Sequence, residues 1–255
     1  DIDALPIHEE NETSYRSQTP GKMHACGHDG HAAVLLSAAK ILSERKDELA
    51  GKLVFVFQPA EEVVGGAQAM LADGALEGLA PDHAIGLHLS STHPTGLVAV
   101  REGPSMAASD AFRVTIRGRG GHAARPQDAV DPILVAAQLI STLQSLVARE
   151  VDPVDQAVIS ITSVQGGSAY NIIPEEVELK GTLRTFLAPT RAYLKDRLEA
   201  VVQGVASTLR AQASFEFLHG SPAVVNDAAM TERFRRVVRE VVGEARLSES
   251  PQIMG

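Results

Sequence analysis

The sequence predicts an α/β protein in which a small βαββαβ domain is inserted into a larger, partial α/β catalytic domain. Apolar runs with helical and strand-like spacing alternate before residue 105. From residue 106 to 220 the signals follow the order β-α-β-β-α-β, which is the split ferredoxin-like unit. A helical pattern resumes after Pro222, so we expect residues 1–105 and 221–255 to share the larger domain.

In residues 1–105, helical and strand-like patterns alternate, which is typical of a largely parallel sheet covered by helices. The expected elements are helices at 30–49 and 66–76 and strands at 53–57 and 83–89. The run LVFVF at 53–57 has no polar alternation, which predicts a strand buried on both faces. Ligands bind outside the carboxyl ends of such strands, so 58–62 and 86–91 are expected at a site.

The second region combines alternating strands with amphipathic helices. The expected elements are strands at 111–118, 156–164, 176–186 and 213–220, with helices at 130–149 and 190–212. A further helix is expected after Pro222, where Phe234, Val237, Val238 and Val241 recur at helical spacing.

Composition excludes several classes of partner. The chain has 255 residues, a formal net charge of −9 and 44% hydrophobic residues. Such a surface does not attract phosphate backbones or anionic lipids, so we expect neither nucleic acid nor a membrane as partner. No uninterrupted apolar run reaches the roughly 18 residues of a membrane span. The single cysteine excludes an internal disulfide and fits a reducing cytoplasm, where we expect the protein.

Both ends of the chain look cut from inside a longer fold. Asp1 is followed at once by IDALP, and the chain stops at SPQIMG without a charged tail. We therefore expect the chain to be part of a longer protein.

The segment MHACGHDGH at 23–31 places the only cysteine, Cys26, among three histidines. A lone cysteine is usually a small buried hydrophobe, but these neighbours are polar and rich in glycine. In one interpretation Cys26 is a nucleophile with a nearby histidine as its base. A tight loop aims Cys26 and His28 poorly at each other for proton transfer. In the second interpretation Cys26 and His28 are ligands of a metal, which would hold the sulfur as thiolate.

A metal site would take further ligands from other strand ends. Glu61 and Glu62 follow the apolar run at 53–57, and His88 lies near the end of the run at 83–89. Adjacent glutamates are most often solvated, and His88 alone fits an ordinary strand-end histidine equally well. After a buried strand, however, a glutamate pair offers one metal ligand and one group that handles a proton.

Seven motifs, in order along the whole chain, resemble the metallopeptidase-like amidohydrolases, a family of aminoacylases, hippurate hydrolases and auxin-conjugate hydrolases. They are DIDALP at 1–6, KMHACGHDGHAAVLL at 22–36, FQPAEE at 57–62, GLH at 86–88, GRGGHAARP at 118–126, YNIIPEE at 170–176 and GTLRTF at 181–186. The resemblance implies a zinc-peptidase-like catalytic domain with two metal ions and a ferredoxin-like lid that forms a homodimer. Family members also extend before the DIDALP motif and beyond Gly255, toward a Glu-Asp motif and a last ligand histidine.

The resemblance also implies the ligands of two divalent ions. Cys26 would bridge both ions, in place of the bridging Asp of other branches of the superfamily. His28 and His88 would complete the shell of one ion, and Glu62 would bind the other. Zn suits the thiolate best, while Mn, Co and Ni are further candidates.

Further roles follow from the same resemblance. Glu61 would be the general base that activates water, while Asp3 and Asp29 would orient the ligands. His122 would reach the partner subunit's active site and stabilise the oxyanion, although a histidine in a Gly-rich turn is ordinarily a surface residue.

Asn171 and Arg184 match positions that hold the free carboxylate of the substrate in this family. Arg suits that task because its planar fork pairs with a carboxylate through two hydrogen bonds. Arg184 on an alternating strand fits an ordinary exposed charge as well.

The leading hypothesis is hydrolysis of the amide bond of N-acyl amino acids, or of similar small carboxylate-bearing amides, by water that two metal ions activate. The alternative is a non-catalytic fragment or homologue that serves mainly as a dimerisation module. A thiol hydrolase is a third possibility, and its activity would survive chelation but not alkylation of the thiol.

Overall fold

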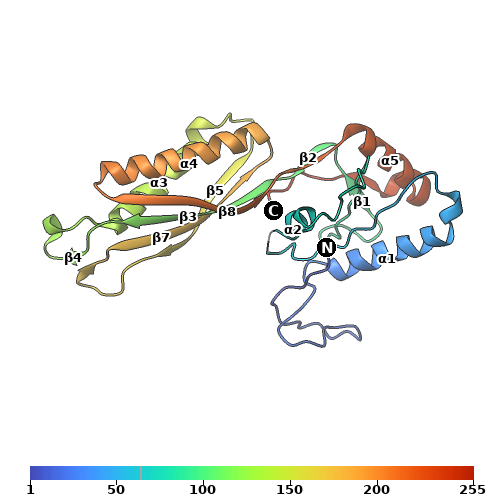
Figure 1. Ribbon diagram of the computed structural model, residues 1–255, viewed down its shortest axis with the longest axis horizontal. Helices are drawn as coiled ribbons and strands as arrows, with labels where there is room; N and C mark the ends of the chain where they lie inside the picture. Colours follow the sequence, from blue (N-terminus) through green and yellow to red (C-terminus); the bar gives the residue numbers. More distant parts are fainter. Residues whose placement is uncertain (64) are drawn as a thin grey trace. The chain divides into compact units, whose positions relative to one another are not determined.

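The computed structural model describes residues 1–63 and 65–255 (Figure 1). These residues form two compact units, 1–95 and 96–255, and each unit is described by itself. Helices and strands are both present, so the chain has mixed α/β content.

The first unit contains two α-helices and long segments to which no helix or strand is assigned. Helix α1 spans His28–Glu44 and helix α2 spans Gly66–Ala72, with a 3-10 turn at Lys46–Glu48. Both helices were predicted, but α1 begins earlier and ends earlier than expected, and α2 is shorter. Helix α1 begins directly after Gly27, whose φ of 83° is readily adopted only by glycine.

The predicted strands at 53–57 and 83–89 are wrong for the described part of the first unit. Neither run has a strand assigned to it. Their apolar side chains are open, with Leu53 50% and Leu87 53% exposed, and Ile41 on α1 is 57% exposed. A β-strand requires a ladder of hydrogen bonds to a neighbouring strand, and the apolar pattern alone does not provide that neighbour.

The second unit is organised around a four-stranded antiparallel sheet with the order β5-β7-β3-β8. The strands are β3 Ala108–Arg117, β5 Ala157–Gln165, β7 Glu176–Thr185 and β8 Gln212–Ser221, and the helices between them are α3 Pro132–Glu150 and α4 Ala188–Thr208. The element order β-α-β-β-α-β and the approximate bounds agree with the sequence prediction.

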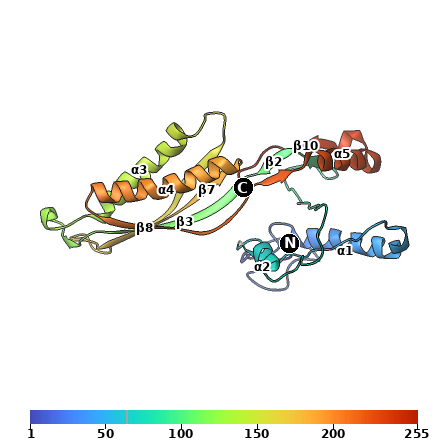
Figure 2. The same cartoon turned by 45° about the horizontal axis from the view of Figure 1, so that its top comes forward.

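The core of this unit lies between the sheet and helices α3 and α4, which cover one face of the sheet (Figures 1 and 2). Alternate residues of β3 and β7 point into it, which matches the period of two in their sequences. Its fully buried side chains include Phe112, Ile116, Leu139, Leu143, Leu179, Leu183, Leu194 and Leu198. The other face is polar, and Arg113 there pairs with Glu178 at 3.3 Å and Glu216 at 3.0 Å.

Side-chain caps start two of the helices in this unit. Asp131 precedes α3, and its Oδ1 accepts the backbone N–H of Ile133 at 2.9 Å. Asp227 precedes α5 (Ala228–Val242) and accepts the N–H of Met230 at 2.8 Å. These carboxylates satisfy N–H groups that the first turn of a helix leaves unpaired.

Short strand pairs complete the second unit. They are β1 Val98–Val100 with β10 Leu247–Glu249 in parallel, β2 Gly103–Met106 with β9 Val224–Asn226, and β4 Gly121–His122 with β6 Ile172–Ile173. Two 3-10 turns lie at Pro126–Asp128 and Glu244–Arg246. The sequence predicted none of these pairs, because runs of two to four residues carry too little periodicity.

Helix α3 is long and apolar enough to cross a membrane by length and composition alone, and it is the one such helix among the residues described. Its residues Leu139, Leu143 and Leu146 are fully buried in the core of the second unit. Its apolar composition therefore has an explanation in the packing of α3 against the sheet.

Truncating Leu198 to alanine is expected to destabilise the second unit by about 2–5 kcal/mol, because it removes a fully buried side chain and leaves a cavity. The matched control is Leu134→Ala on α3, where the side chain is 61% exposed and little change is expected. Thermal and urea unfolding of the two variants measure the difference. Equal destabilisation by both would contradict this assignment of the core.

Candidate metal centre

Metal-ligating side chains from four segments of the first unit converge on one place. The sets whose donor atoms all lie within 4.8 Å of one another are Cys26, His28 and His88; Asp1, His28 and His31; and His28, Glu61 and Glu62. His28 belongs to all three sets, so a ring nitrogen of His28 lies within 4.8 Å of donor atoms from each of them. The structure thus brings together Cys26, His28, Glu62 and His88, the predicted metal ligands, with Glu61 beside them.

His28 is the first residue of α1 and is only 1% exposed. Its Nδ1 lies 3.0 Å from the backbone carbonyl oxygen of Asp3. A carbonyl oxygen only accepts, so we assign the proton to Nδ1, which leaves the lone pair of Nε2 free. That Nε2 lies 3.6 Å from Asp1 Oδ2, 3.9 Å from Glu61 Oε2 and 3.8 Å from Glu62 Oε1.

Cys26 and His88 form a second set of donors with His28. The Sγ of Cys26 lies 3.5 Å from Nε2 of His88, and Nδ1 of His88 lies 2.6 Å from the carbonyl oxygen of Leu89. Burial raises the pKa of the Cys26 thiol, and the negative charges of Glu62 and Glu61 raise it further. A bound cation reverses this effect, because it stabilises the thiolate directly.

Asp3 connects the start of the chain to the glutamate pair. Its Oδ2 accepts the backbone N–H of Glu62 at 3.0 Å, and its Oδ1 lies 3.3 Å from Nδ1 of His28. Burial acts to raise the pKa of Asp3, but the backbone N–H groups of Glu62 and Glu61 outweigh it, and the pKa lies below its ordinary value. Asp3 is therefore a carboxylate that holds the glutamate segment against the first residue of α1.

Two glycines allow the segments to approach so closely. A Cβ on Gly66 would lie 1.6 Å from the carbonyl oxygen of Pro59, so only glycine fits at the start of α2 beside the glutamate segment. A Cβ on Gly30 would lie 2.4 Å from Cδ1 of Leu89, next to His88. The contact at Gly66 is with backbone, whereas the contact at Gly30 is with the side chain of Leu89.

Asp1 and His31, for which the sequence predicted no role, belong to the cluster that the three donor sets form. Nδ1 of His31 lies 2.6 Å from Asp1 Oδ1, and Nε2 of His31 accepts the N–H of Leu89 at 2.8 Å. Burial lowers the pKa of His31, and the nearby imidazoles of His88 and His28 lower it further. One signal was available, because His28 and His31 are three residues apart and share a helix face.

The cluster fits a divalent cation. Buried side-chain atoms without a hydrogen-bond partner among the described residues include Nε2 of His28, Oε1 of Glu62 and Oδ1 of Asp3. Unpaired buried polar atoms are rare, and here they belong to groups that donate electron pairs to metals. Sulfur, imidazole and carboxylate donors together suit Zn and its first-row neighbours.

Asp29 differs from the other predicted residues. It is exposed in the first turn of α1 and lies outside the three sets of donor atoms. Its predicted role in orienting ligands stays a prediction.

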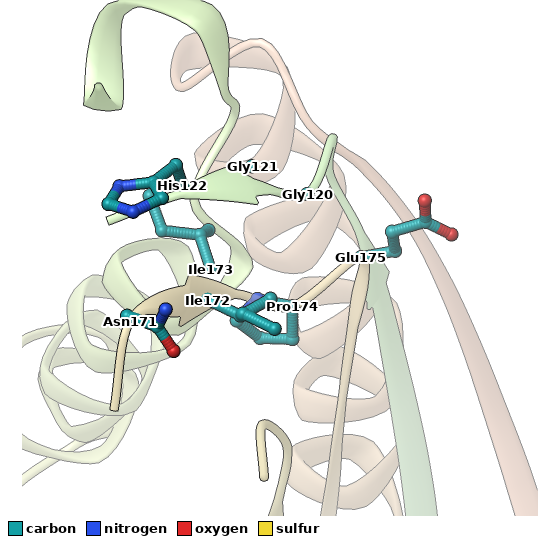
Figure 3. A pocket seen from close by; sticks show the side chains of 8 residues that line it. All are labelled: Gly120, Gly121, His122, Asn171, Ile172, Ile173, Pro174 and Glu175. Carbon is teal, nitrogen blue, oxygen red and sulfur yellow. The ribbon is translucent and has the colours of Figure 1, made fainter. Parts of the chain in front are cut away.

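His122 and Asn171 come together in the second unit. His122 lies on β4 and pairs with Ile172 of β6, while the carbonyl oxygen of Asn171 accepts the N–H of Ala123 at 3.0 Å. Figure 3 shows both side chains at one end of an open pocket of about 480 Å³, with Glu175 at the other end. The remaining lining residues are Gly120, Gly121, Ile172, Ile173 and Pro174.

Arg184 lies apart from this pocket. Strand β7 begins at Glu176, just beyond the pocket, and Arg184 lies near its other end. At about 3.3 Å per residue, the two positions are separated by about 26 Å. The Nε of Arg184 donates to the carbonyl oxygen of Met254 at 3.1 Å. Asn171 lies in the segment that leads into β7, whereas Arg184 lies near the far end of that strand.

Comparisons with known proteins agree with these features. The profile described as Peptidase family M20/M25/M40 matches residues 1–255. The chain is 42% identical over 259 residues to the IAA-amino acid hydrolase ILR1-like 4 of Arabidopsis thaliana, covering 100% of this chain and 58% of that protein. It is 44% identical over 227 residues to the N-acyl-L-amino acid amidohydrolase of Geobacillus stearothermophilus, covering 89% of this chain and 61% of that protein.

The fold is also similar to that of a solved metalloenzyme. The YXEP protein of Bacillus subtilis, described as a dinuclear metal binding peptidase from the M20 family, has a TM-score of 0.83 and 36% identity. The match covers 99% of this chain and 64% of that one. The chain thus spans less than two thirds of the length of these relatives.

Proposed function

Because the chain belongs to peptidase family M20/M25/M40, we propose that it is part of a metal-dependent amidohydrolase that cleaves N-acyl amino acids into a carboxylic acid and an amino acid. The observation that carries the proposal is the convergence of three donor sets on His28. Relatives named for hydrolysis of amino-acid conjugates and of N-acyl amino acids support the substrate class.

Two divalent ions are proposed at this centre, and Cys26, His28, His88 and Glu62 would hold them. The free lone pair of His28 and the unpaired Oε1 of Glu62 support these roles. When bound, the ions supply Lewis acidity that lowers the pKa of water and polarises a carbonyl. The thiolate favours Zn, with Mn, Co and Ni as further candidates.

Glu61 is the proposed general base. Its carboxylate lies at the edge of the cluster, 3.9 Å from Nε2 of His28, and its side chain is 47% exposed, so a substrate can reach it. In the proposal Glu61 accepts a proton from the attacking water and delivers it to the leaving nitrogen. Asp3 holds the neighbouring backbone in place through its bond to Glu62, and Asp29 is proposed to orient ligands as well.

The βαββαβ part, within residues 106–220, is proposed to be a ferredoxin-like lid and homodimerisation domain, with 1–105 and 221–255 belonging to the catalytic domain. His122 is proposed to donate a hydrogen bond to the oxyanion in the partner subunit's site. Asn171, beside it in the pocket, and Arg184 are proposed to bind the substrate carboxylate.

Removal of metal tests the proposal directly. Chelation is expected to abolish hydrolysis of N-acetyl amino acids, and added Zn or Mn is expected to restore it, as measured by release of the free amino acid. Activity that survives chelation but not thiol alkylation would identify a thiol hydrolase instead. A protein that binds metal but hydrolyses no N-acyl amino acid in a panel would favour the non-catalytic dimerisation module.

A further inference from the structure

We propose that Asp1 and His31 form a positioning pair that fixes the backbone carrying His88 and turns one oxygen of Asp1 toward the metal centre. In this arrangement His31 is not a metal ligand, although it lies among the ligands. The inference rests on the proposed metal-dependent function and adds two residues to it.

Both ring nitrogens of His31 are already occupied. The backbone N–H of Leu89 can only donate, so Nε2 of His31 accepts this bond at 2.8 Å. The proton of the neutral ring then lies on Nδ1 and is donated to Asp1 Oδ1 at 2.6 Å. No lone pair remains on the ring to bind an ion, which separates His31 from His28, whose Nε2 has no such partner in the described structure.

The bond from Leu89 fixes the position of the adjacent ligand. Nδ1 of His88 bonds to the carbonyl oxygen of Leu89 at 2.6 Å, so His31 and His88 hold the same residue by its N–H and its carbonyl. The ring of His88 also lies edge-on to that of His31, with centroids 4.5 Å apart and planes at 70°. These contacts aim Nε2 of His88 at the sulfur of Cys26, 3.5 Å away.

The bond to Nδ1 also sets the direction of Asp1. With Oδ1 held by His31, Oδ2 lies 3.6 Å from the free Nε2 of His28. A carboxylate there would add negative charge beside a bound cation. It would also limit how far the side chains of the cluster can move. Groups that form hydrogen bonds to metal ligands hold those ligands in the orientation that the metal needs. Their loss typically weakens metal binding by about 10–100-fold.

The experiment measures Co²⁺ binding by the metal-free protein, using the visible absorption that arises from a thiolate–cobalt bond. His31→Ala is expected to weaken Co²⁺ binding by about 10–100-fold and to change this band. His31→Asn places a donor toward Asp1, and His31→Gln places an acceptor toward Leu89, so each is expected to restore part of the affinity. Asp1→Asn keeps an oxygen for His31 but removes the charge, and an intermediate affinity is expected.

The matched control is His83→Ala, which removes an exposed histidine from the segment that leads to His88 and should leave cobalt affinity unchanged. Cobalt affinity of His31→Ala equal to that of the unaltered protein would overturn the inference. So would a lower melting temperature of the metal-free variant with unchanged affinity, because the pair would then be purely structural. Failure of the unaltered protein to bind Co²⁺ would instead overturn the proposed function.

Discussion

Glu61→Gln is expected to lower kcat for N-acyl amino acid hydrolysis by about 10²–10⁴-fold while metal content stays the same. Glutamine has nearly the same shape but cannot accept a proton at neutral pH. The neighbouring Glu62, not Glu61, has the buried and unpaired oxygen that faces the donors, so loss of Glu61 should leave the cluster intact. Steady-state kinetics together with metal analysis of the same sample measure both quantities.

The control for this experiment is Glu10→Gln, which changes an exposed glutamate outside the cluster and should leave kcat and metal content unaltered. Retained turnover in Glu61→Gln would remove Glu61 from the reaction. Loss of metal together with turnover would instead show that Glu61 is a ligand, and the two glutamates would exchange roles.

Loss of a group that only orients a metal ligand typically weakens metal binding by roughly 10–100-fold. Cys26→Ala is expected to weaken metal binding by more than this and to abolish turnover. The thiol lies among the imidazoles and carboxylates of the cluster, so its removal deletes a donor rather than a support. Cys26→Asp restores an ionised donor at that position and is expected to recover part of the metal content. Metal analysis after dialysis against a weak chelator measures the metal content of each protein. We expect it to be highest in the unaltered protein, lower in Cys26→Asp and lowest in Cys26→Ala.

Thiol alkylation gives an independent measurement on the unaltered protein, because Cys26 is the only cysteine. Burial and the nearby carboxylates raise the pKa of this thiol, so its reaction with iodoacetamide in the metal-free protein should be slow at neutral pH and faster at higher pH. Bound metal should protect the sulfur. Equal alkylation with and without metal, or full metal content in Cys26→Ala, would rule out a sulfur ligand.

The second unit was largely predictable from the sequence because each main strand and helix packs against elements of the same unit. On β3 and β7 the buried residues alternate, and the helices that cover them carry matching apolar faces. Each element thus has its partner within the same βαββαβ order. The short pair β1–β10 was not predictable, since Val98 and Leu247 are far apart in sequence and neither run is long enough to show a period.

The runs at 53–57 and 83–89 show the limit of reasoning from apolar pattern. Their composition favours strands, but a strand also needs a neighbour, and the described part of the first unit supplies none to either run. Glu62 and His88 were expected at a site because they follow predicted strands, and their side chains do lie in the cluster although neither run is assigned as a strand.

Asp1 and His31 were missed for a different reason. Their roles depend on a backbone N–H of Leu89 and on one oxygen of a carboxylate, and neither feature is visible in a sequence. His28 and His31 look alike in the motif HDGH, yet only the folded chain distinguishes the ring with a free nitrogen from the ring with none.

Asn171, ahead of β7, and Arg184, near the far end of β7, lie well apart, and this separation has a consequence for how the rate responds to dilution. Within one copy of the chain, a small carboxylate held by Arg184 is out of reach of Asn171. If both residues bind the same substrate molecule, each must come from a different copy. Turnover per molecule then falls when the protein is diluted below the concentration at which two copies stay associated.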